Sequence, residues 1–170
     1  MKMRREIRLI RHAPSWDNDA AHASAALRQM LGDNAVEVQH IGATAVRGIL
    51  AVPVIDLAVG VREGIAESAV LDILCRSGYV RIPPDAEGCL RAARLRRDRT
   101  ADQFRVWITR YGGEKWHSLL AFRDYLNNHV FAANEYEELK KRLAREHRSD
   151  PVAYAAGKND FIQSMLRLSF

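Results

Sequence analysis

Asp56 is the residue of this sequence whose position most needs a chemical explanation. It interrupts the run 54–59, Val-Ile-Asp-Leu-Ala-Val, whose β-branched residues between Pro53 and Gly60 predict an interior strand. A lone carboxylate in such a strand is costly to bury unless a cation, a hydrogen-bond donor or solvent meets it. Asp56 is therefore the first candidate for binding a metal ion or a polar ligand.

A glycine turn precedes this strand and could supply the other half of a site. A strand is predicted over 35–40, and Gly42, Ala43 and Thr44 follow it as a tight turn. Backbone N–H groups of such a turn can hold phosphate oxygens, while a carboxylate holds Mg²⁺ against them. Gly42 would allow close approach and Thr44 would add a hydroxyl. The alternative is that Gly42 only makes a turn and Asp56 is paired with an arginine.

Four further side chains are candidates for ligand contacts. Tyr154 and Lys158 lie four residues apart on one face of a predicted helix. They either reach a phosphate and a base or ribose, or form a surface lysine packed over a tyrosine ring. Arg123 could reach the Asp56 carboxylate or a ligand phosphate, although a structural ion pair is the expected role for such an arginine. The adjacent Asp124 is expected to point away from Arg123. His40 is expected to hydrogen-bond the loop rather than to act in catalysis.

The elements that position these side chains are mixed strands and helices in the first part of the chain and helices alone in the last part. Ser15 is expected to cap the first helix, and Asp150 with Pro151 opens the last one. Lys140 and Lys141 are expected on a solvated helix face. This order of elements predicts an α+β fold. The predicted helices cover 16–31, 65–75, 116–126, 130–147 and 151–168, and the predicted strands cover 35–40, 54–59, 79–82 and 104–109.

Two segments leave their structure open. Residues 4–11 alternate enough to suggest an edge strand or an extended arm. Residues 91–99 carry five arginines, and they form either a strand with a basic face or a solvated loop. The five are Arg91, Arg94, Arg96, Arg97 and Arg99.

Composition bounds the class of protein. The 170 residues fit one domain, with mixed sheet and helices over 1–113 and helices over 114–170. The net charge of +5 is carried mostly by arginine, which permits a phosphate-bearing partner without requiring one. Two cysteines, Cys75 and Cys89, suggest neither a disulfide scaffold nor a metal cluster. No apolar run reaches membrane-spanning length, so we expect a cytoplasmic protein with no membrane partner.

The stretch 40–61, HIGATAVRGILAVPVIDLAVGV, resembles the signature of the GrpB family, in which His-(Val/Ile)-Gly-Ser-Thr precedes Lys-Pro-Ile-Ile-Asp. Three other segments resemble the family as well: 9–16, 120–126 and 136–140, with Tyr154 and Lys158 ahead of Phe161. The resemblance covers nearly the whole chain.

The resemblance implies a fold similar to the nucleotidyltransferase superfamily, a mixed sheet in which a Gly-Ser turn grips a triphosphate and paired acids bind two metals. It makes Gly42 and Ala43 the turn and Asp56 the first metal carboxylate. Members also occur fused to dephospho-CoA kinase, which implies an accessory role related to nucleotides or CoA.

The sequence departs from that pattern at the positions that would do the chemistry. Ala43 stands where the turn serine is expected, and Ala58 stands where the second acid is expected. Arg105 and Trp107 replace the two histidines of a His-x-His strand. Asp98 and Asp102 are the nearest acids that could complete a metal site.

Three hypotheses follow. The first is a GrpB-family domain that binds a nucleotide or phosphorylated small molecule, with degenerate catalysis. In this hypothesis the anion-binding turn consists of Gly42, Ala43 and Thr44, with His40 beside it. Asp56 makes a metal or polar contact. The opposite wall of the site consists of Arg123, Tyr154 and Lys158. The second is an active Mg²⁺-dependent nucleotidyltransferase with an unusual acid set, so Mg²⁺ is the candidate cofactor. The third is a protein- or RNA-interaction module that uses segment 91–99; nucleic acid is the less favoured partner because aromatic-and-basic RNA motifs are missing.

Overall fold

Five strands form one mixed sheet in the computed structural model, which describes residues 6–95 and 103–170. The strand order is β1-β2-β5-β4-β3. The two central strands, β2 and β5, run parallel, and the other neighbours are antiparallel. The strands are β1 (Ala35–Ile41), β2 (Val54–Val61), β3 (Val80–Ile82), β4 (Leu90–Leu95) and β5 (Gln103–Arg110).

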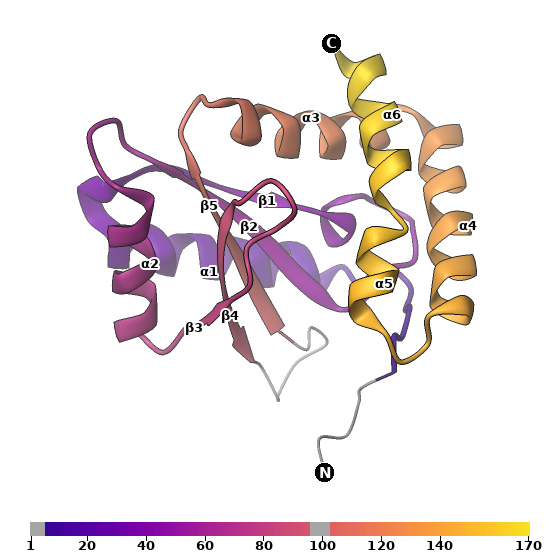
Figure 1. The fold of residues 1–170 in the computed structure, drawn as a ribbon, viewed down its shortest axis with the longest axis horizontal. Helices are drawn as coiled ribbons and strands as arrows, with labels where there is room; N and C mark the ends of the chain where they lie inside the picture. Colours follow the sequence, from indigo (N-terminus) through magenta and orange to yellow (C-terminus); the bar gives the residue numbers. More distant parts are fainter. Residues whose placement is uncertain (1–5, 96–102) are drawn as a thin grey trace.

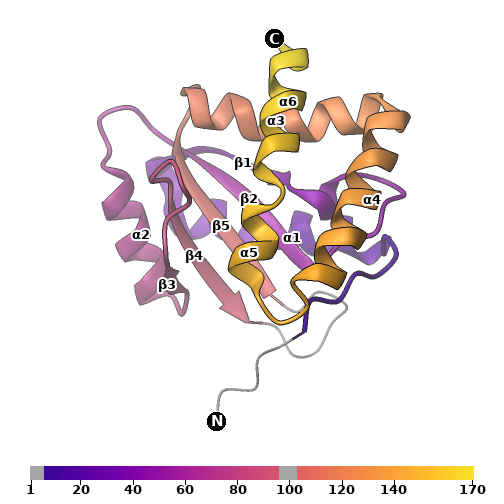
Figure 2. The same cartoon turned by 45° about the vertical axis from the view of Figure 1, so that its right-hand side comes forward.

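Helices cover the two faces of the sheet unequally. Figures 1 and 2 show α1 behind the sheet, while α5 and α6 stand in front of it, α3 crosses one end and α4 lies beside α6. The helix α2 packs with α1 on the rear face, where both contribute to one core. The helices are α1 (Ser15–Leu31), α2 (Glu67–Arg76), α3 (Glu114–Asn128), α4 (Val130–Glu146), α5 (Pro151–Ala156) and α6 (Asn159–Ser169).

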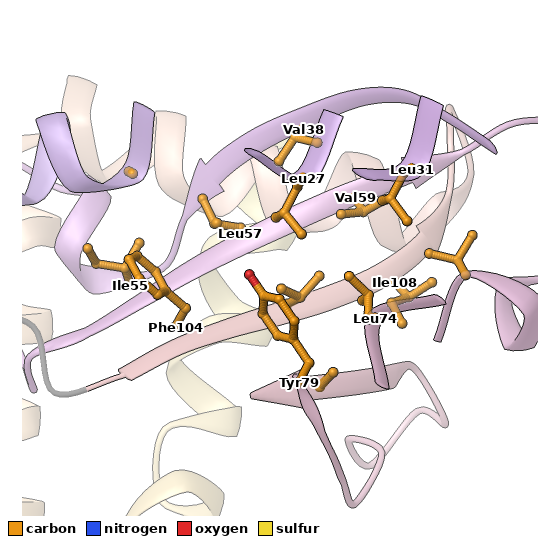
Figure 3. Close-up of a cluster of buried hydrophobic side chains, with 14 of the residues drawn as sticks. Leu27, Leu31, Val38, Ile55, Leu57, Val59, Leu74, Tyr79, Phe104 and Ile108 are labelled. Carbon is orange, nitrogen blue, oxygen red and sulfur yellow. The ribbon is translucent and has the colours of Figure 1, made fainter. Parts of the chain in front are cut away.

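The strand β2 separates apolar from polar side chains by its alternation. Ile55, Leu57 and Val59 are buried in the core under α1 and α2, and Figure 3 shows Leu57 and Val59 beside Leu27 of α1 and Ile55 beside Phe104. Successive side chains of a strand point to opposite faces. Asp56 therefore points to the face that α3, α5 and α6 cover.

A smaller core joins the helices on that second face. Phe122 and Leu126 of α3 meet Tyr136 of α4 and Met165 of α6, together with Val46 from the loop between β1 and β2. The aromatic rings hold this group together: the ring of Tyr136 is edge-on to Phe122, with centroids 5.3 Å apart. This core fixes the helices over the polar side of the sheet.

The predicted α+β class is confirmed, since a five-stranded mixed sheet carries flanking helices and ends in a helical part. The short strand at 35–41 and the helix at 130–146 fall within one residue of their predicted bounds. In the described part of the chain, no helix is both long enough and apolar enough to cross a membrane.

Two details of the helices differ from expectation. Ser15 is the first residue of α1 and not its cap, because Pro14 holds the N-cap position and no side chain caps that end. The helix predicted over 151–168 is broken between α5 and α6. Gly157 lies at this break, so close to α4 that an added Cβ would be 2.4 Å from Leu143. The N–H of Lys158 donates to the carbonyl of Ala155, three residues back, and this bond tightens the turn. Asp150 does cap α5, accepting from Ala153 N–H at 3.0 Å.

The two open segments are also placed. Within 6–11, Ile10 forms a single bridge to Ala51, so the described part of this segment is an arm and not a strand of the sheet. Residues 90–95 form β4, and Arg96, Arg97 and Arg99 lie outside the described residues.

Candidate functional site

The Asp56 carboxylate is held by two residues of the neighbouring strand β5. Its Oδ1 accepts a hydrogen bond from Trp107 Nε1 at 2.9 Å and lies 3.6 Å from Arg105 Nη1. Parallel pairing sets Asp56 opposite Arg105, and alternation brings Trp107 to the same face. This contact agrees with the alternative given in the sequence analysis, in which Asp56 is paired with an arginine.

Gly42 lies against the other oxygen of the same carboxylate. A Cβ at position 42 would be 2.8 Å from Asp56 Oδ2, and the backbone φ there is 75°. Antiparallel pairing explains the contact, because Ile41 is the register partner of Asp56 and the chain turns directly after it. Only glycine fits this position, both for its backbone conformation and for the space available. The structure thus brings the turn and the carboxylate together.

The rest of the turn closes on protein groups. The Thr44 hydroxyl donates to the carbonyl of Val54 at 3.2 Å and lies 2.9 Å from His40 Nε2. Since a hydroxyl has one proton, His40 Nε2–H is the donor in the second bond. Burial lowers the pKa of His40 to about 4, despite the opposing charges of Asp17 and Asp56, so the ring is neutral at neutral pH. Ala43 is half-buried and packs against both cores. His40 has the structural hydrogen bond that we expected.

Arg123 joins α3 to β1 and not to Asp56. Its Nη1 donates to Gln39 Oε1 at 2.8 Å and to the carbonyl of His40 at 2.9 Å. Its Nε donates to Asp124 Oδ1 at 2.7 Å. The expectation that Arg123 and Asp124 point apart is wrong, because the long Arg123 side chain reaches the neighbouring carboxylate.

Lys158 and Tyr154 come to the polar face from the junction of α5 and α6. The Lys158 amine lies 4.6 Å from the centre of the Tyr154 ring. Tyr154 is buried, and burial raises its pKa. Burial lowers the pKa of Lys158 to about 8, with Asp56 acting against that shift and Arg105 adding to it. The charges of Asp56 on β2 and Arg105 on β5 therefore both act on the Lys158 amine.

Arg91 of β4 completes the group. Its guanidinium lies 4.9 Å from the centre of the Trp107 ring, a cation–π contact. Burial lowers the pKa of Arg91, and repulsion by Arg105 lowers it further, while Asp85 and Asp56 oppose the shift. We call Asp56, Arg91, Arg105, Trp107 and Lys158 the Asp56 cluster. It has three cations and one carboxylate.

The arginines of segment 91–99 do not form one basic face within the described residues. Arg91 stacks on Trp107, whereas Arg94 lies 5.8 Å from the ring centre of Tyr79, which belongs to the core on the opposite face. Strand alternation separates them. Arg91 and Arg94 therefore do not share a surface, and Arg96, on which the interaction-module hypothesis also depends, lies outside the described residues.

Lys140 does not lie on a solvated face, contrary to expectation. It is 1 % exposed, and its amine donates to the carbonyl of Leu50. Glu137 accepts from Leu50 N–H at 2.6 Å, so one turn of α4 holds both polar groups of a single residue in the loop before β2. Burial lowers the pKa of Lys140 to about 7. Lys141 instead pairs with Glu137 and Glu138.

The polar face does not fit a magnesium site. Mg²⁺ is normally held by one or two carboxylates with open positions for water and phosphate oxygens. Here Oδ1 of Asp56 faces an indole N–H and a guanidinium, and Oδ2 faces Gly42. Across residues 6–95 and 103–170, no three His, Cys, Asp or Glu side chains gather in a way that could hold a metal ion. Asp98 and Asp102 lie outside the described residues.

Two surface hollows lie away from Asp56. One, of about 550 Å³, lies at the ends of β4 and β5 beside the start of α3. The other, of about 310 Å³, lies between the amino-terminal arm, residues 48–50 and α4. The Asp56 cluster is packed more tightly, with 15 % of the Asp56 side chain and 30 % of the Arg105 side chain exposed. We place the candidate site at the cluster because it combines uncompensated charge with partial access.

Sequence reasoning did not assign Arg91, Arg105 and Trp107 to the candidate site. The signal for the last two was present, since Phe104, Val106 and Ile108 alternate as core residues and so direct positions 105 and 107 to the other face. What the sequence did not show was that β5 pairs with β2 across about fifty residues of intervening chain.

Comparison with known proteins places the chain in a family. The sequence model described as "GrpB: GrpB protein" matches residues 6–168. The "Glutamate-rich protein GrpB" of Alkalihalophilus pseudofirmus is 29% identical over 165 residues, which are 95% of this chain and 94% of that protein. The "UPF0157 protein YqkA" of Bacillus subtilis is 27% identical over 161 residues; the match covers 95% of this chain but 46% of that longer protein.

A solved structure agrees with these matches. The crystal structure of the conserved protein GrpB from Enterococcus faecalis is similar to this fold with a TM-score of 0.79 and 28% sequence identity. The similarity covers 95% of this chain and 96% of that one. Sequence and fold agree over nearly the whole chain, and the chain belongs to the GrpB family.

Proposed function

We propose that this protein binds a nucleotide or another phosphorylated small molecule at the Asp56 cluster, and that it does not catalyse nucleotidyl transfer. The observation that carries the proposal is the excess of positive charge. Arg105 pairs with the Asp56 carboxylate on a partly buried face of the sheet, and the same carboxylate acts on Arg91 and Lys158. The Asp85 carboxylate, which also acts on Arg91, is paired with Lys115. A phosphate group would compensate that excess.

The chemistry of the side chains favours phosphate over other anions. A guanidinium presents a planar set of N–H donors that matches phosphate oxygens, and Arg105 is 30 % exposed. The Trp107 ring offers a flat surface beside it, already used by Arg91 and, at 5.6 Å, by Lys115. A base or another flat group of the ligand could stack there in place of a cation.

The ligand class is also what the resemblance to nucleotidyltransferases implies, because that resemblance makes Gly42 and Ala43 the phosphate-binding turn and Asp56 the strand carboxylate. The residues here argue against retained transfer chemistry. Position 58 is alanine, and the single carboxylate is neutralised by Arg105. Two-metal catalysis needs ions about 3.5–4 Å apart and acids to hold them. The association with dephospho-CoA kinase adds CoA-type compounds to the ligands worth testing.

The test is a thermal-shift and calorimetric screen with ATP, GTP, CTP, UTP and CoA against the wild type, Arg105→Met and Arg81→Met. A ligand that binds the folded state raises apparent stability by mass action. Arg81 is a matched control, because it is an exposed arginine on β3 that pairs with Asp72 at the surface. We expect saturable binding that Arg105→Met weakens about tenfold or more and that Arg81→Met leaves unchanged. Absence of saturable binding to every ligand would overturn the proposal, as would equal losses in the two variants.

A further inference from the structure

We infer that the site takes its phosphate as a free anion, held by Arg105 and Lys158, with no divalent cation between protein and ligand. In this arrangement Asp56 is a positioning residue that fixes Arg105 and Trp107 and is not a metal ligand. The inference rests on the proposed function and says how the ligand is recognised.

The first step is that the Asp56 carboxylate is already engaged by protein groups. Oδ1 accepts from Trp107 at 2.9 Å with Arg105 Nη1 at 3.6 Å, and Oδ2 faces the backbone of Gly42. A divalent cation bound at this carboxylate would sit beside a guanidinium that cannot lose its charge. Each metal contact would therefore add charge repulsion to a group of residues that already carries too much positive charge.

The second step is that Arg105 still has a donor to offer. Its Nε is buried, and no residue in the described ranges accepts a hydrogen bond from it. A buried donor without a partner is costly. The contact with Asp56 uses one edge of the guanidinium through Nη1, which leaves the Nε side for an incoming oxygen. Two adjacent N–H groups of a guanidinium can bind two oxygens of one phosphate.

The third step is that the cations repel one another as they stand. Arg105 lowers the pKa of Arg91 and adds to the lowered pKa of Lys158, and Asp56 opposes both shifts only in part. A phosphate placed among them would act on all three in the same favourable direction. A magnesium-complexed phosphate would act less strongly, because the metal cancels part of the charge that the protein needs. The ligand class is thus an uncomplexed phosphate or diphosphate group.

The experiment measures binding of ATP and of inorganic pyrophosphate to the wild type by calorimetry, in excess EDTA and in excess Mg²⁺. We expect both probes to bind in EDTA at least as tightly as in Mg²⁺. Binding that requires Mg²⁺ would overturn this inference and leave the proposed function standing. No binding in either condition would overturn both. The two failures are therefore distinguishable.

A second comparison tests the role of Asp56 directly, with Asp56→Asn beside Asp124→Asn. Asparagine keeps an oxygen that can accept from Trp107 but removes the charge. If Asp56 only positions its neighbours, Asp56→Asn should change the affinity for pyrophosphate by the same factor in EDTA and in Mg²⁺. If Asp56 holds a metal, the affinity should fall about tenfold or more in Mg²⁺ alone, and that result would overturn the inference. Asp124 is exposed and bonded to Arg123, so its variant should match the wild type.

Discussion

The two faces of the sheet are built from the same strands and differ in almost every other respect. The face under α1 and α2 is a continuous apolar core, to which Leu57 and Val106 contribute with no exposed surface. The opposite face places Asp56, Arg105 and Trp107 at alternate positions of the same two strands. One face can supply stability through area removed from water, whereas the other concentrates charge at a cost in desolvation.

This contrast indicates a division of labour within β2 and β5. A protein that needed only to fold would gain more from apolar residues at 56 and 105, since replacing buried ion pairs by apolar groups is often neutral or stabilising. Charged residues that are retained there point to a use for their charge. Changes on the rear face should therefore alter stability, and changes on the polar face should alter binding.

The largest expected effect is the loss of core packing on the rear face. Leu57→Ala should lower the free energy of unfolding by about 2–5 kcal/mol, because it leaves a cavity in a fully buried layer. Chemical denaturation measures the change. Val36→Ala on β1 is the control, as Val36 is an exposed apolar residue and its truncation should cost less than about 0.5 kcal/mol. Equal losses in both variants would contradict the assignment of the core to this face.

The turn against Asp56 should give the next largest effect. Gly42→Ala should cost about 1–3 kcal/mol, since it combines a positive φ with a Cβ only 2.8 Å from Asp56 Oδ2. Gly48→Ala separates the two causes, because Gly48 also has a positive φ but nothing within 4 Å of its Cβ position. The difference between the two variants in urea unfolding measures the close approach. A difference of zero would mean that the contact with Asp56 carries no energy.

Lys140 should make stability depend on pH. Burial lowers its folded pKa to about 7 from the ordinary lysine value of 10.5, so between pH 7 and 9 the unfolded chain binds a proton that the folded chain lacks. Stability should therefore rise with pH over that window, by up to about 1.4 kcal/mol per pH unit for one such group. Lys158, with a pKa of about 8, adds an effect of the same sign in the upper half of the window.

Lys140→Met should flatten that rise, and Lys141→Met should not, because Lys141 is only half-buried and paired with glutamates. Denaturation curves of the three proteins at about pH 7, 8 and 9 measure the slopes. A wild-type stability that falls across this range would mean that the buried amine stays charged.

The smallest effect on stability is expected where the effect on binding is largest. Arg105→Met should change the free energy of unfolding by less than about 1 kcal/mol, because the Arg105 side chain is partly exposed, its ion pair with Asp56 is long at 3.6 Å, and methionine keeps a long side chain of similar reach. Asp56 keeps its bond from Trp107 in that variant. A loss of several kcal/mol would show that the polar face, too, is mainly a stabilising one.

Much of this architecture could be predicted from local patterns. The alternation around Asp56 predicted an interior strand, and apolar spacing predicted α1 and α4, because each pattern depends on residues close in the sequence. The contact between Gly42 and Asp56 followed from the same reasoning, as a strand, a tight turn and a returning strand must lie side by side.

The errors came from tertiary contacts that no local pattern encodes. Lys140 sits in a charged helix segment that is typical of a solvated face, yet the carbonyl of Leu50 draws its amine into the interior. The break at Gly157 depends on the closeness of Leu143 in α4. The pairing of Asp56 with Arg105 required knowledge of which strands are neighbours in the sheet.

The two hydrogen bonds between α4 and Leu50 have a consequence for the order in which the chain folds. The two residues that hold the Leu50 N–H and carbonyl lie 87 and 90 positions further along the chain. During synthesis the amino-terminal hairpin of β1 and β2 can pair early, and Ile10 can bridge Ala51 of its connecting loop, but Leu50 gains its two partners only after α4 has left the ribosome. Nascent chains that stop before Glu137 should therefore leave both backbone groups of Leu50 without these bonds. The polar face of the sheet is covered only after the helices α3 to α6 have been synthesised.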